Sequence, residues 1–288
     1  MIGSSGQLGT DLMEAFGTDR SFEAVGLTHA DIEVSGCKAE SRLIELKPAV
    51  VVNTAAFHRT EACEDDAPRA FAVNSLGAFH VAKASRALEA VNIYQSTDYV
   101  FSGGKGVSYS EEDEADPINV YGASKLAGEK ITAGYSTKYY VVRSSSLFGV
   151  AGSSGKGGNF VESILKQARA GAEIRVVNDI TMSPTYTKDL AAAIVEMIKR
   201  KPPYGVYHVT NSGSCTWWQF ASDIVRLAGL EVEVKKSSSA DRISKVRRPS
   251  ISALSNSKLA GFGIKMRDYK DALRDYLVAK GHLPKTNR

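Results

Sequence analysis

The sequence predicts an α/β fold in which a doubly wound parallel sheet is covered by helices on both faces and is followed by a smaller C-terminal lobe. Over the first 210 residues, short β-branched runs alternate with longer stretches that carry apolar residues at helical spacing. The 288 residues are 43% apolar, which is enough to bury a substantial core. A stretch rich in Gly and Ser, Val150–Gly158, interrupts the alternation and indicates a flexible loop or a crossover between domains.

Six short runs rich in β-branched residues predict strands at Phe22–Leu27, Ala49–Asn53, Val91–Gln95, Tyr139–Arg143, Ile174–Val177 and Val206–Val209. Between them, apolar residues recur every three or four positions and predict helices at Gln7–Phe16, Pro68–Glu89, Gly122–Ala133, Phe160–Arg169 and Lys188–Lys199. Helices are also expected at Trp217–Leu227 and Tyr269–Leu277, joined by the polar, basic segment Lys235–Arg248. Long helices between short strands are typical of parallel sheets.

Charge and cysteine usage exclude several classes of protein. The 36 basic and 32 acidic residues leave a net charge of only +4, too little to indicate nucleic acid or membrane partners. No apolar run approaches the roughly 18 residues of a spanning helix, and the N-terminus does not resemble a signal peptide, so we expect a cytoplasmic protein. Cys37, Cys63 and Cys215 lie far apart and are expected to be free thiols.

A glycine-rich loop stands at the start of the chain. Gly3, Gly6 and Gly9 form a GxxGxxG pattern directly before an amphipathic helix. Such glycines permit a tight turn and let backbone N–H groups approach a pyrophosphate. A buried strand of about five residues should precede the loop, yet only Met1 and Ile2 do. Either the start of the chain is assigned too late or part of a nucleotide site is missing, and we favour the first.

Tyr121 and Lys125 lie four residues apart in NVYGASK, so on a helix their side chains share one face. A phenol with a pKa of about 10 is a poor acid at neutral pH, and an adjacent ammonium is expected to lower that pKa. An isolated YxxxK is usually an ordinary helix pair, so a third residue decides. Thr97, in YQSTDYVFSG, offers a hydroxyl at the carboxyl end of a strand, where it can hold a carbonyl oxygen against Tyr121.

Nine segments resemble, in order, the pattern of the extended short-chain dehydrogenases/reductases: GSSGQLG, NTAAF, STDYVFSG, YGASKLAGE, RSSSLFG, GGNF, SPTYTKDLA, GVYHVTNSG and RRPSISAL. Within that family the chain is most similar to the dTDP-4-dehydrorhamnose reductase group, over nearly its whole length. The resemblance implies a Rossmann-type dinucleotide-binding domain of residues 1–149 plus 183–210, and a substrate-binding lobe of residues 150–182 plus 211–288. It implies hydride transfer from NADPH or NADH to the ketone of a nucleotide-diphosphate sugar of the 4-keto-6-deoxy type, and it leaves a homodimer open.

The resemblance also implies roles for single residues. The catalytic residues would be Thr97, Tyr121 and Lys125, with Tyr121 giving the proton and Lys125 also binding the nicotinamide ribose. The cofactor-binding set comprises Gly3, Gly6, Gln7, Leu8, Gly9, Glu33, Ala55, Ala56, Tyr121 and Lys125. The substrate-binding set comprises Thr97, Asp98, Tyr99, Ser146, Asn159 and Arg248. We name no metal ligand.

Three departures from the family pattern concern specificity. Relatives often carry a Trp where this chain has Ser146, and their DQxGxPT motif is here DITMSPT, with Ile180 and Met182 in place of Gln and Gly. Both changes put the identity of the sugar in doubt. After the second strand the chain reads Thr28-His29, where an Arg often receives a 2′-phosphate, so a preference for NADP is unsupported.

Weaker signals have ordinary explanations. His58 and Arg59 are as readily a solvated loop pair as substrate contacts, and His208 is expected to be a core histidine. Two charge runs are expected to be mainly solvated: Glu61, Glu64, Asp65 and Asp66, and Lys235, Lys236, Arg242, Lys245, Arg247 and Arg248. The aromatic residues Trp217, Trp218 and Phe220 are expected in the core of the C-terminal lobe.

Two other functions share this pattern. Sugar-nucleotide epimerases and dehydratases have the same fold and triad but keep their NAD bound through the cycle. Some relatives are non-catalytic regulatory subunits; the presence of Thr97, Tyr121 and Lys125 argues against that role, whereas Ser146 and the short first strand argue mildly for it.

Overall fold

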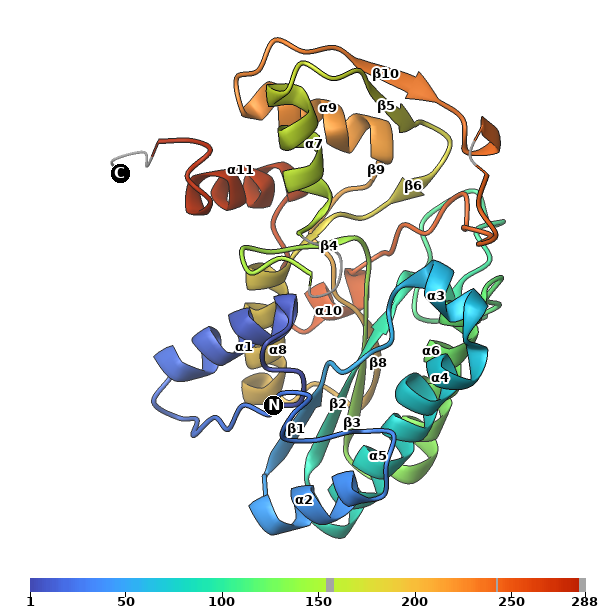
Figure 1. The fold of residues 1–288 in the computed structure, drawn as a ribbon. Helices are drawn as coiled ribbons and strands as arrows, with labels where there is room; N and C mark the ends of the chain where they lie inside the picture. Colours follow the sequence, from blue (N-terminus) through green and yellow to red (C-terminus); the bar gives the residue numbers. More distant parts are fainter. Residues whose placement is uncertain (154–157, 242, 285–288) are drawn as a thin grey trace.

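A computed structural model describes residues 1–153, 158–241 and 243–284, and it confirms the α/β architecture with a central parallel sheet (Figure 1). The sheet contains β1 (Val50–Asn53), β2 (Val91–Thr97), β3 (Tyr139–Ser144) and β8 (Gly205–His208), in that spatial order and all parallel. The sequence predicted these four strands to within two residues at each end. All four carboxyl ends therefore open toward the same edge of the sheet.

The strand expected at Phe22–Leu27 is not formed, and this prediction was wrong. Only Leu27 pairs, as an isolated parallel bridge to Ile2, which bridges in parallel to Asn53 on its other side. Ile2 N–H donates to the Val52 carbonyl at 2.9 Å, and Leu27 N–H donates to the Met1 carbonyl at 2.8 Å. The Met1 ammonium also donates to the Val25 carbonyl at 2.8 Å, so residues 25 and 27 contact Met1 and Ile2 without forming a regular ladder.

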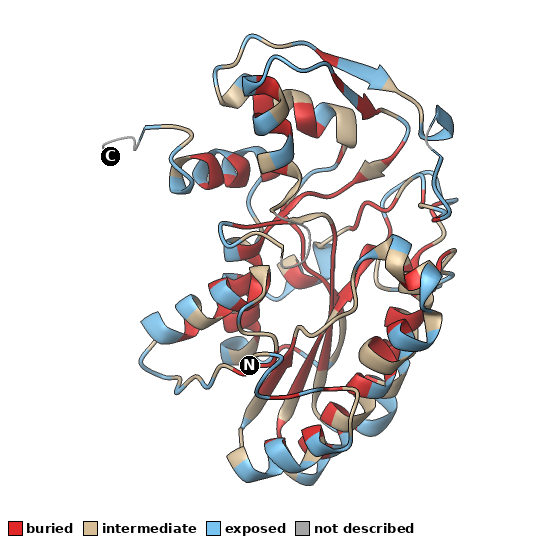
Figure 2. Cartoon of the chain, in the orientation of Figure 1, coloured by how far each residue is buried: buried red, intermediate tan, exposed pale blue. Residues whose placement is uncertain are grey.

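Helices cover both faces of the sheet because side chains alternate along each strand. Val52 packs with α1 (Gln7–Thr18) and α8 (Thr187–Arg200), while its neighbour Val51 packs on the opposite face. That opposite face carries α2 (Lys38–Leu46), α5 (Gly77–Ala87) and α6 (Val120–Tyr135). Figure 2 shows the strands as a mostly buried layer between helices whose outer sides are exposed.

The helix expected at Pro68–Glu89 is formed in three pieces. After α3 (Thr60–Asp65), the chain forms α4 (Ala67–Phe71), a π-helical turn (Ala72–Leu76) and α5 without a break. The buried Asn74 in the π turn donates to the Ser124 hydroxyl of α6 at 2.9 Å. The π turn therefore adjusts the helical run to the helix that carries Tyr121 and Lys125.

The C-terminal lobe has its own apolar core and a second, two-stranded sheet. Its elements are α7 (Phe160–Arg169), β5 (Ile174–Val177), α9 (Trp217–Leu227), β10 (Val234–Ser237) and α11 (Tyr269–Ala279). The strand at Ile174–Val177 has the predicted bounds but belongs to this lobe and not to the main sheet, because it pairs with β10. β10 lies at the start of a segment that composition presented only as a basic linker.

Short elements join the two parts. β4 (Leu147–Phe148) pairs with β7 (Thr185–Tyr186), and β6 (Thr181–Met182) pairs with β9 (Cys215–Thr216). The remaining elements are the 3-10 turns Asp98–Val100 and Ser239–Asp241 and the helix α10 (Ser257–Gly261). Across the described ranges, no helix combines the length and the apolar character needed to span a bilayer.

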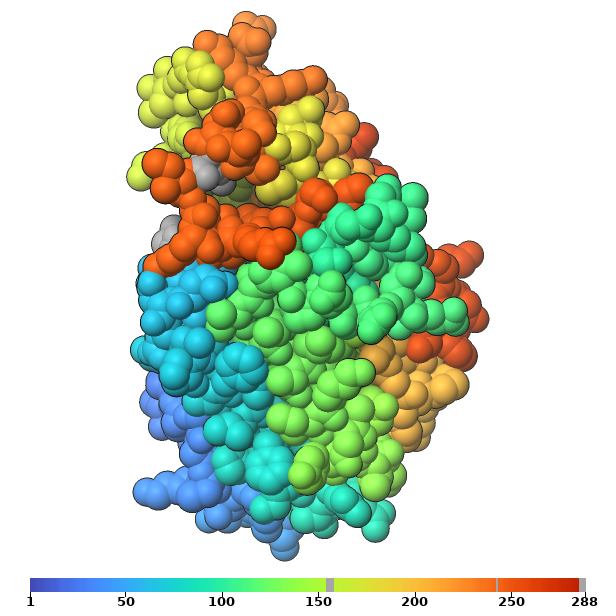
Figure 3. Space-filling model, turned by 90° about the vertical axis from the view of Figure 1, so that its right-hand side faces the viewer, coloured from blue at the N-terminus to red at the C-terminus, as the bar shows by residue number. Residues whose placement is uncertain are grey.

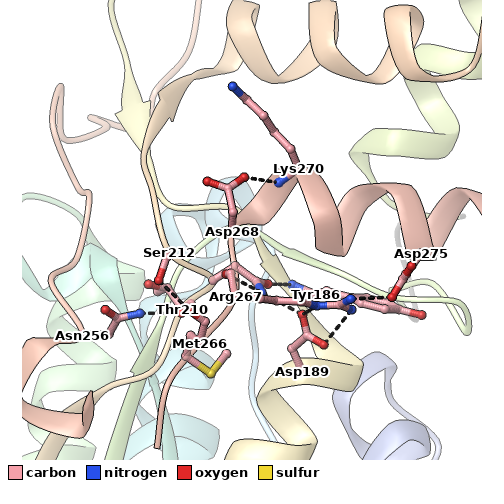
Figure 4. A network of polar contacts seen from close by, with 11 residues as sticks. Tyr186, Asp189, Thr210, Ser212, Asn256, Met266, Arg267, Asp268, Lys270 and Asp275 are labelled. Carbon is pink, nitrogen blue, oxygen red and sulfur yellow. Dashed lines mark hydrogen bonds and ion pairs between the residues drawn. The ribbon is translucent and has the colours of Figure 1, made fainter. Parts of the chain in front are cut away.

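A polar network fixes this junction (Figure 4). Arg267 donates to both carboxylate oxygens of Asp189, at 2.8 and 2.9 Å, and also to Asp275 of α11. The Asn211 amide donates to Asp189 at 2.7 Å, and its oxygen accepts the Tyr186 N–H at 2.8 Å. The start of α8, the chain after β8 and the start of the C-terminal helix are therefore held by one set of bonds.

Candidate active site

A cleft of about 1120 Å³ runs along the carboxyl edge of the main sheet, from the glycine loop to the C-terminal lobe. Ile2 bridges to Leu27 on one side and to Asn53 of β1 on the other, so the strand order reverses direction at Ile2. The cleft lies at this switch point, which is the usual ligand position in doubly wound folds. Every site residue expected from the sequence lines it: Gly3, Gly6, Gln7, Leu8, Gly9, Glu33, Ala55, Ala56, Thr97, Asp98, Tyr99, Tyr121, Lys125, Ser146, Asn159 and Arg248.

The glycine loop forms one end of the cleft. Gly3 has a positive φ of 80°, and a Cβ at Gly9 would lie 2.0 Å from the Gly3 carbonyl oxygen, so no side chain fits there. Gly6 precedes α1 without a side-chain capping bond, and Gln7, Leu8 and Gly9 of the first turn line the cleft. This cradle matches the requirements of a pyrophosphate in space and in charge.

Thr97 and Tyr121 come together although different elements carry them. Thr97 is the last residue of β2, and its hydroxyl accepts the Tyr99 N–H at 3.2 Å. Tyr121 lies in the first turn of α6, whose N-cap Asn119 accepts the Gly122 N–H at 2.8 Å. Burial raises the pKa of Tyr121, and a hydrogen bond with the Thr97 side chain opposes that rise.

Lys125 lies one turn after Tyr121 and is 2% exposed. Its Nζ stands 4.0 Å from the centre of the Tyr94 ring. Burial lowers the pKa of Lys125 to about 7, and the charge of Glu129 opposes this. The expectation that Lys125 lowers the pKa of Tyr121 is therefore not met, because desolvation dominates at both residues.

Asp98 follows Thr97 and is a buried carboxyl group, 4% exposed. It accepts hydrogen bonds from the hydroxyls of Thr97, at 3.1 Å, and Ser145, at 2.8 Å. Burial raises the pKa of Asp98 to about 6. Burial, with a contribution from Asp98, also raises the pKa of the adjacent Tyr99 to about 12.

The acidic and basic runs are mostly exposed, as expected, but some of their members also meet across the mouth of the cleft. Arg248 pairs with Glu61 of α3, and Lys245 pairs with Asp65. Glu64 accepts the Val120 N–H at 2.9 Å, at the start of α6. In Figure 3 the orange segment that contains residues 244–250 lies directly on the light-blue surface of this helical region.

Arg242 and residues 154–157 of the predicted Gly- and Ser-rich loop lie outside the described residues. Within the described ranges, no group of three His, Cys, Asp or Glu side chains is arranged to hold a metal ion. Of the carboxylates in the acidic run, Glu61 and Asp65 form the ion pairs above and Glu64 accepts the Val120 N–H.

Other predicted contacts already make bonds within the protein. The Asn159 amide donates to the Gly149 carbonyl and the Tyr276 hydroxyl, both at 3.0 Å. Glu33 accepts the Ser35 N–H at 3.1 Å and the Ser35 hydroxyl at 2.8 Å. Ser146 has a φ of 47°, in the left-handed region that few side chains adopt.

The smaller sequence signals can also be placed. His208 is fully buried and its Nδ1 contacts the Tyr109 carbonyl at 3.2 Å, as expected for a core histidine. Phe220 is part of the lobe's core, and Trp217 and Trp218 pack against that core. Trp217 and Phe220 also line the cleft, as does His58, whose Nε2 lies 3.1 Å from the Ser153 hydroxyl.

Sequence reasoning missed several groups that surround the site. These include Ser145, which binds Asp98, and the buried pair of Glu129 and Arg143 behind Lys125. Glu129 stands four residues after Lys125, so helical spacing extended by one more turn would have found it. Ser145 carried no such signal, because only the tertiary fold brings it to Asp98.

A doubly wound sheet with a glycine cradle at its switch point, and Thr, Tyr and Lys side chains beside it, defines the class of extended short-chain dehydrogenases/reductases. The family model of the RmlD substrate binding domain matches residues 1–281. The chain therefore belongs to that family.

Named relatives are similar over almost the whole chain. The spore coat polysaccharide biosynthesis protein SpsK of Bacillus subtilis is 36% identical, over 96% of this chain and 95% of that protein. The dTDP-4-dehydrorhamnose reductase of Streptomyces griseus is 34% identical, over 97% and 92%. The structure is similar to that of dTDP-4-dehydrorhamnose reductase from Bacillus anthracis in complex with NADP, with a TM-score of 0.90, 32% identity and coverage of 96% and 97%.

Proposed function

We propose that the protein catalyses the NAD(P)H-dependent reduction of the keto group of a nucleotide-activated 4-keto-6-deoxy sugar. The observation that carries this proposal is the convergence of Thr97, Tyr121 and Lys125 on one cleft that also contains the glycine cradle. Relatives named for this activity match over nearly the whole chain, and one similar structure holds NADP.

The cradle fits the proposed cofactor. Gly3, Gly6, Gln7, Leu8 and Gly9 would hold the pyrophosphate, while Ala55 and Ala56 would lie along the dinucleotide. The close approach of Gly9 to the Gly3 carbonyl supports this, because any larger residue would fill the cradle. Glu33 would bind at the adenosine end, and Lys125 would bind the nicotinamide ribose. When bound, the nicotinamide supplies the hydride.

The chain's own residues would manage the charge that grows on the ketone oxygen. Thr97 and Tyr121 would donate hydrogen bonds to that oxygen, and the Tyr121 hydroxyl would transfer its proton to it. A buried phenol with a raised pKa stays protonated until such an oxygen becomes a stronger base. Asp98, Tyr99, Ser146, Asn159 and Arg248 would line the sugar-nucleotide side, with Arg248 as the cation for the diphosphate.

The test is the oxidation of NADPH and NADH by the purified protein with a panel of nucleotide-linked 4-keto-6-deoxy sugars. We expect turnover with at least one sugar and reduction at C4. If no panel member is reduced although the protein binds cofactor, the function as a reductase is wrong.

The same assay separates the alternatives. An epimerase or dehydratase would retain NAD through purification and consume none, whereas a reductase releases oxidised cofactor after each turnover. A regulatory subunit would bind the nucleotide sugar without changing it. The three residues in the cleft favour catalysis.

Three finer features are part of the proposal. The chain would divide into a dinucleotide-binding domain of residues 1–149 plus 183–210 and a substrate-binding lobe of residues 150–182 plus 211–288. The protein would work in the cytoplasm, where the free thiols Cys37, Cys63 and Cys215 stay reduced. It would act as a homodimer, which light scattering after size exclusion would test.

A further inference from the structure

Helix α6 presents three functional groups on one face. Tyr121, Lys125 and Glu129 follow each other at intervals of four residues, so each lies one turn from the next. Lys125 and Glu129 are 2% and 4% exposed. Burying two charges on one helix face is unfavourable unless partners compensate them.

The Glu129 carboxylate accepts three hydrogen bonds from two residues. Arg143 of β3 donates from Nε to Oε1 at 2.9 Å and from Nη2 to Oε2 at 2.6 Å. Ser96 of β2 donates to Oε1 at 2.5 Å. Ser96 and Arg143 are paired neighbours in the sheet, so the strands themselves fix both donors. These bonds fix the orientation of the Glu129 carboxylate. Glu129 itself lies one helical turn after Lys125, on the same face of α6.

The Arg143 guanidinium is equally fixed. It is 5% exposed, and it stacks on the Phe101 ring at 5.0 Å. Its Nη1 has no hydrogen-bond partner within the described residues. Its strand neighbour His208 contributes no charge at neutral pH, because burial and the Arg143 charge lower the pKa of His208 to about 3. The Arg143 charge also acts on the carboxyl group of Glu111.

We propose that Glu129, paired with Arg143, is a positioning residue that keeps Lys125 in its charged form for the proposed reaction. This inference rests on the proposed function, because it concerns the ammonium that would bind the ribose and assist Tyr121. Glu129 touches neither substrate nor cofactor and acts only through Lys125.

The charged and titratable groups around Lys125 support this role. Tyr94 of β2 lies under the ammonium, and Tyr121 and Glu129 flank it on α6. Asp98 after β2 and Cys63 of α3 act on the pKa of Tyr121. Burial lowers the pKa of Lys125 and the charge of Glu129 raises it, and the net result is a pKa of about 7. Removing the Glu129 charge should therefore lower the pKa of Lys125 further.

Two substitutions that break the same ion pair should have opposite effects. Glu129→Gln leaves the Arg143 guanidinium as an uncompensated charge, which disfavours the Lys125 ammonium. Arg143→Met leaves the Glu129 carboxylate without its guanidinium partner, which favours the Lys125 ammonium. If the pair has a purely structural role, both variants should lose stability and the pKa of Lys125 should not shift in opposite directions. Ser96→Ala, which keeps both charges, is the matched control.

The experiment measures the free energy of unfolding between pH 5.5 and 9.5, without cofactor or substrate. Each protein is compared with a version of itself that also carries Lys125→Met, and the difference isolates the contribution of Lys125. A lysine whose folded pKa lies below its unfolded pKa makes stability rise with pH above the folded pKa, because the unfolded state then binds more protons. The pH at which this rise begins therefore reports the pKa of Lys125 in the folded protein. We expect the onset near pH 7 in the wild type.

We expect the onset to move down by about one pH unit or more in Glu129→Gln, to move up by a similar amount in Arg143→Met, and to stay in Ser96→Ala. The pH at which NADPH binding weakens, followed by cofactor fluorescence, should move in the same directions. The proposal is overturned if the onset pH moves in the same direction in Glu129→Gln and Arg143→Met, or does not move in either. If one of these variants does not fold, the direction of the shift in the other decides. The unfolding measurement needs no substrate, so a failed reductase assay would leave this result readable.

Discussion

At the scale of single residues, the site is built from groups whose hydrogen bonds within the protein fix their orientation. Thr97 illustrates this, because its hydroxyl accepts the Tyr99 N–H and donates to Asp98 while it contacts Tyr121. The hydroxyl is therefore already oriented at the carboxyl end of β2. Its single proton is directed at Asp98 in this structure, so the hydroxyl would have to turn away from that carboxyl group to donate to a ketone oxygen.

Tyr121→Phe should lower kcat by about a hundredfold or more, because it removes only the phenolic oxygen that would give the proton. Cofactor affinity should change little, since the ring and α6 remain. Steady-state turnover and the dissociation constant of NADPH are the two measurements. Turnover near that of the wild type would exclude Tyr121 as the proton donor.

Ser146→Trp should shift selectivity toward dTDP-4-dehydrorhamnose, because related reductases often carry a Trp here and a flat ring packs against a sugar face. The positive φ of Ser146 makes some loss of stability expected as well. Ser146→Gly accepts the same φ without adding a ring and is the control. The measurement is the ratio of kcat/KM for that sugar and for a related nucleotide sugar. An equal ratio in all three proteins would show that residue 146 does not contact the sugar.

At the scale of elements, position along the sheet decides what each segment can do. Ile2 pairs on both sides and sets the floor of the glycine loop, and α1 begins where that loop ends. The π turn plays a similar part for α6, since Asn74 contacts Ser124 there. Both devices place a helix start or a helix face at the cleft.

Gly9→Ala should weaken both folding and cofactor binding, because the added Cβ would lie 2.0 Å from the Gly3 carbonyl oxygen. Gly17→Ala is a control in the same helix, since its Cβ would meet nothing within 4 Å. Replacing that exposed glycine by alanine should stabilise the protein by about 0.5 to 1 kcal/mol. Thermal melting and NADPH titration of both variants are the measurements. If Gly9→Ala melted and bound like the wild type, the close approach would not be a constraint.

At the scale of the whole molecule, polar contacts between distant segments hold the cleft in shape. Arg248 and Lys245 reach α3 on one side, and the Arg267 network joins α8 to α11 on the other. Three of these pairs, Arg248–Glu61, Lys245–Asp65 and Arg267–Asp189, join residues that are 187, 180 and 78 positions apart in the sequence. The relative position of the sheet and the lobe therefore depends on them.

Arg267→Ala should lower stability by about 1 to 3 kcal/mol, since it removes a bidentate, charge-assisted contact with Asp189 and a second contact with Asp275. Arg200→Ala removes a single exposed pair with Glu196 and should cost less than about 0.5 kcal/mol. Urea unfolding of both variants gives the comparison, and kcat/KM well below the melting temperature should stay unchanged because Arg267 does not line the cleft. Equal stability of the two variants would contradict a special role of the junction.

Local pattern determined most of the elements and the residues proposed for the site. The spacing of Tyr121 and Lys125, the three glycines and the strand that ends at Thr97 are short-range features, and the resemblance to a family joined them into one cleft. Helices such as Phe160–Arg169 and Trp217–Leu227 have the predicted bounds because their amphipathic periodicity is strong.

Only the tertiary structure decided which strand pairs with which, and what charge each buried group carries. Phe22–Leu27 has strand composition but forms only an isolated bridge, between Leu27 and Ile2. Ile174–Val177 joins β10 in a second sheet. In both cases the hydrogen-bond partners are distant in sequence. Lys125 follows Tyr121 as predicted, yet its pKa depends on burial and on Glu129, whose orientation Arg143 and Ser96 set from other strands. Electrostatic environments are sums over neighbours in space, so residue spacing along one helix could not reveal them.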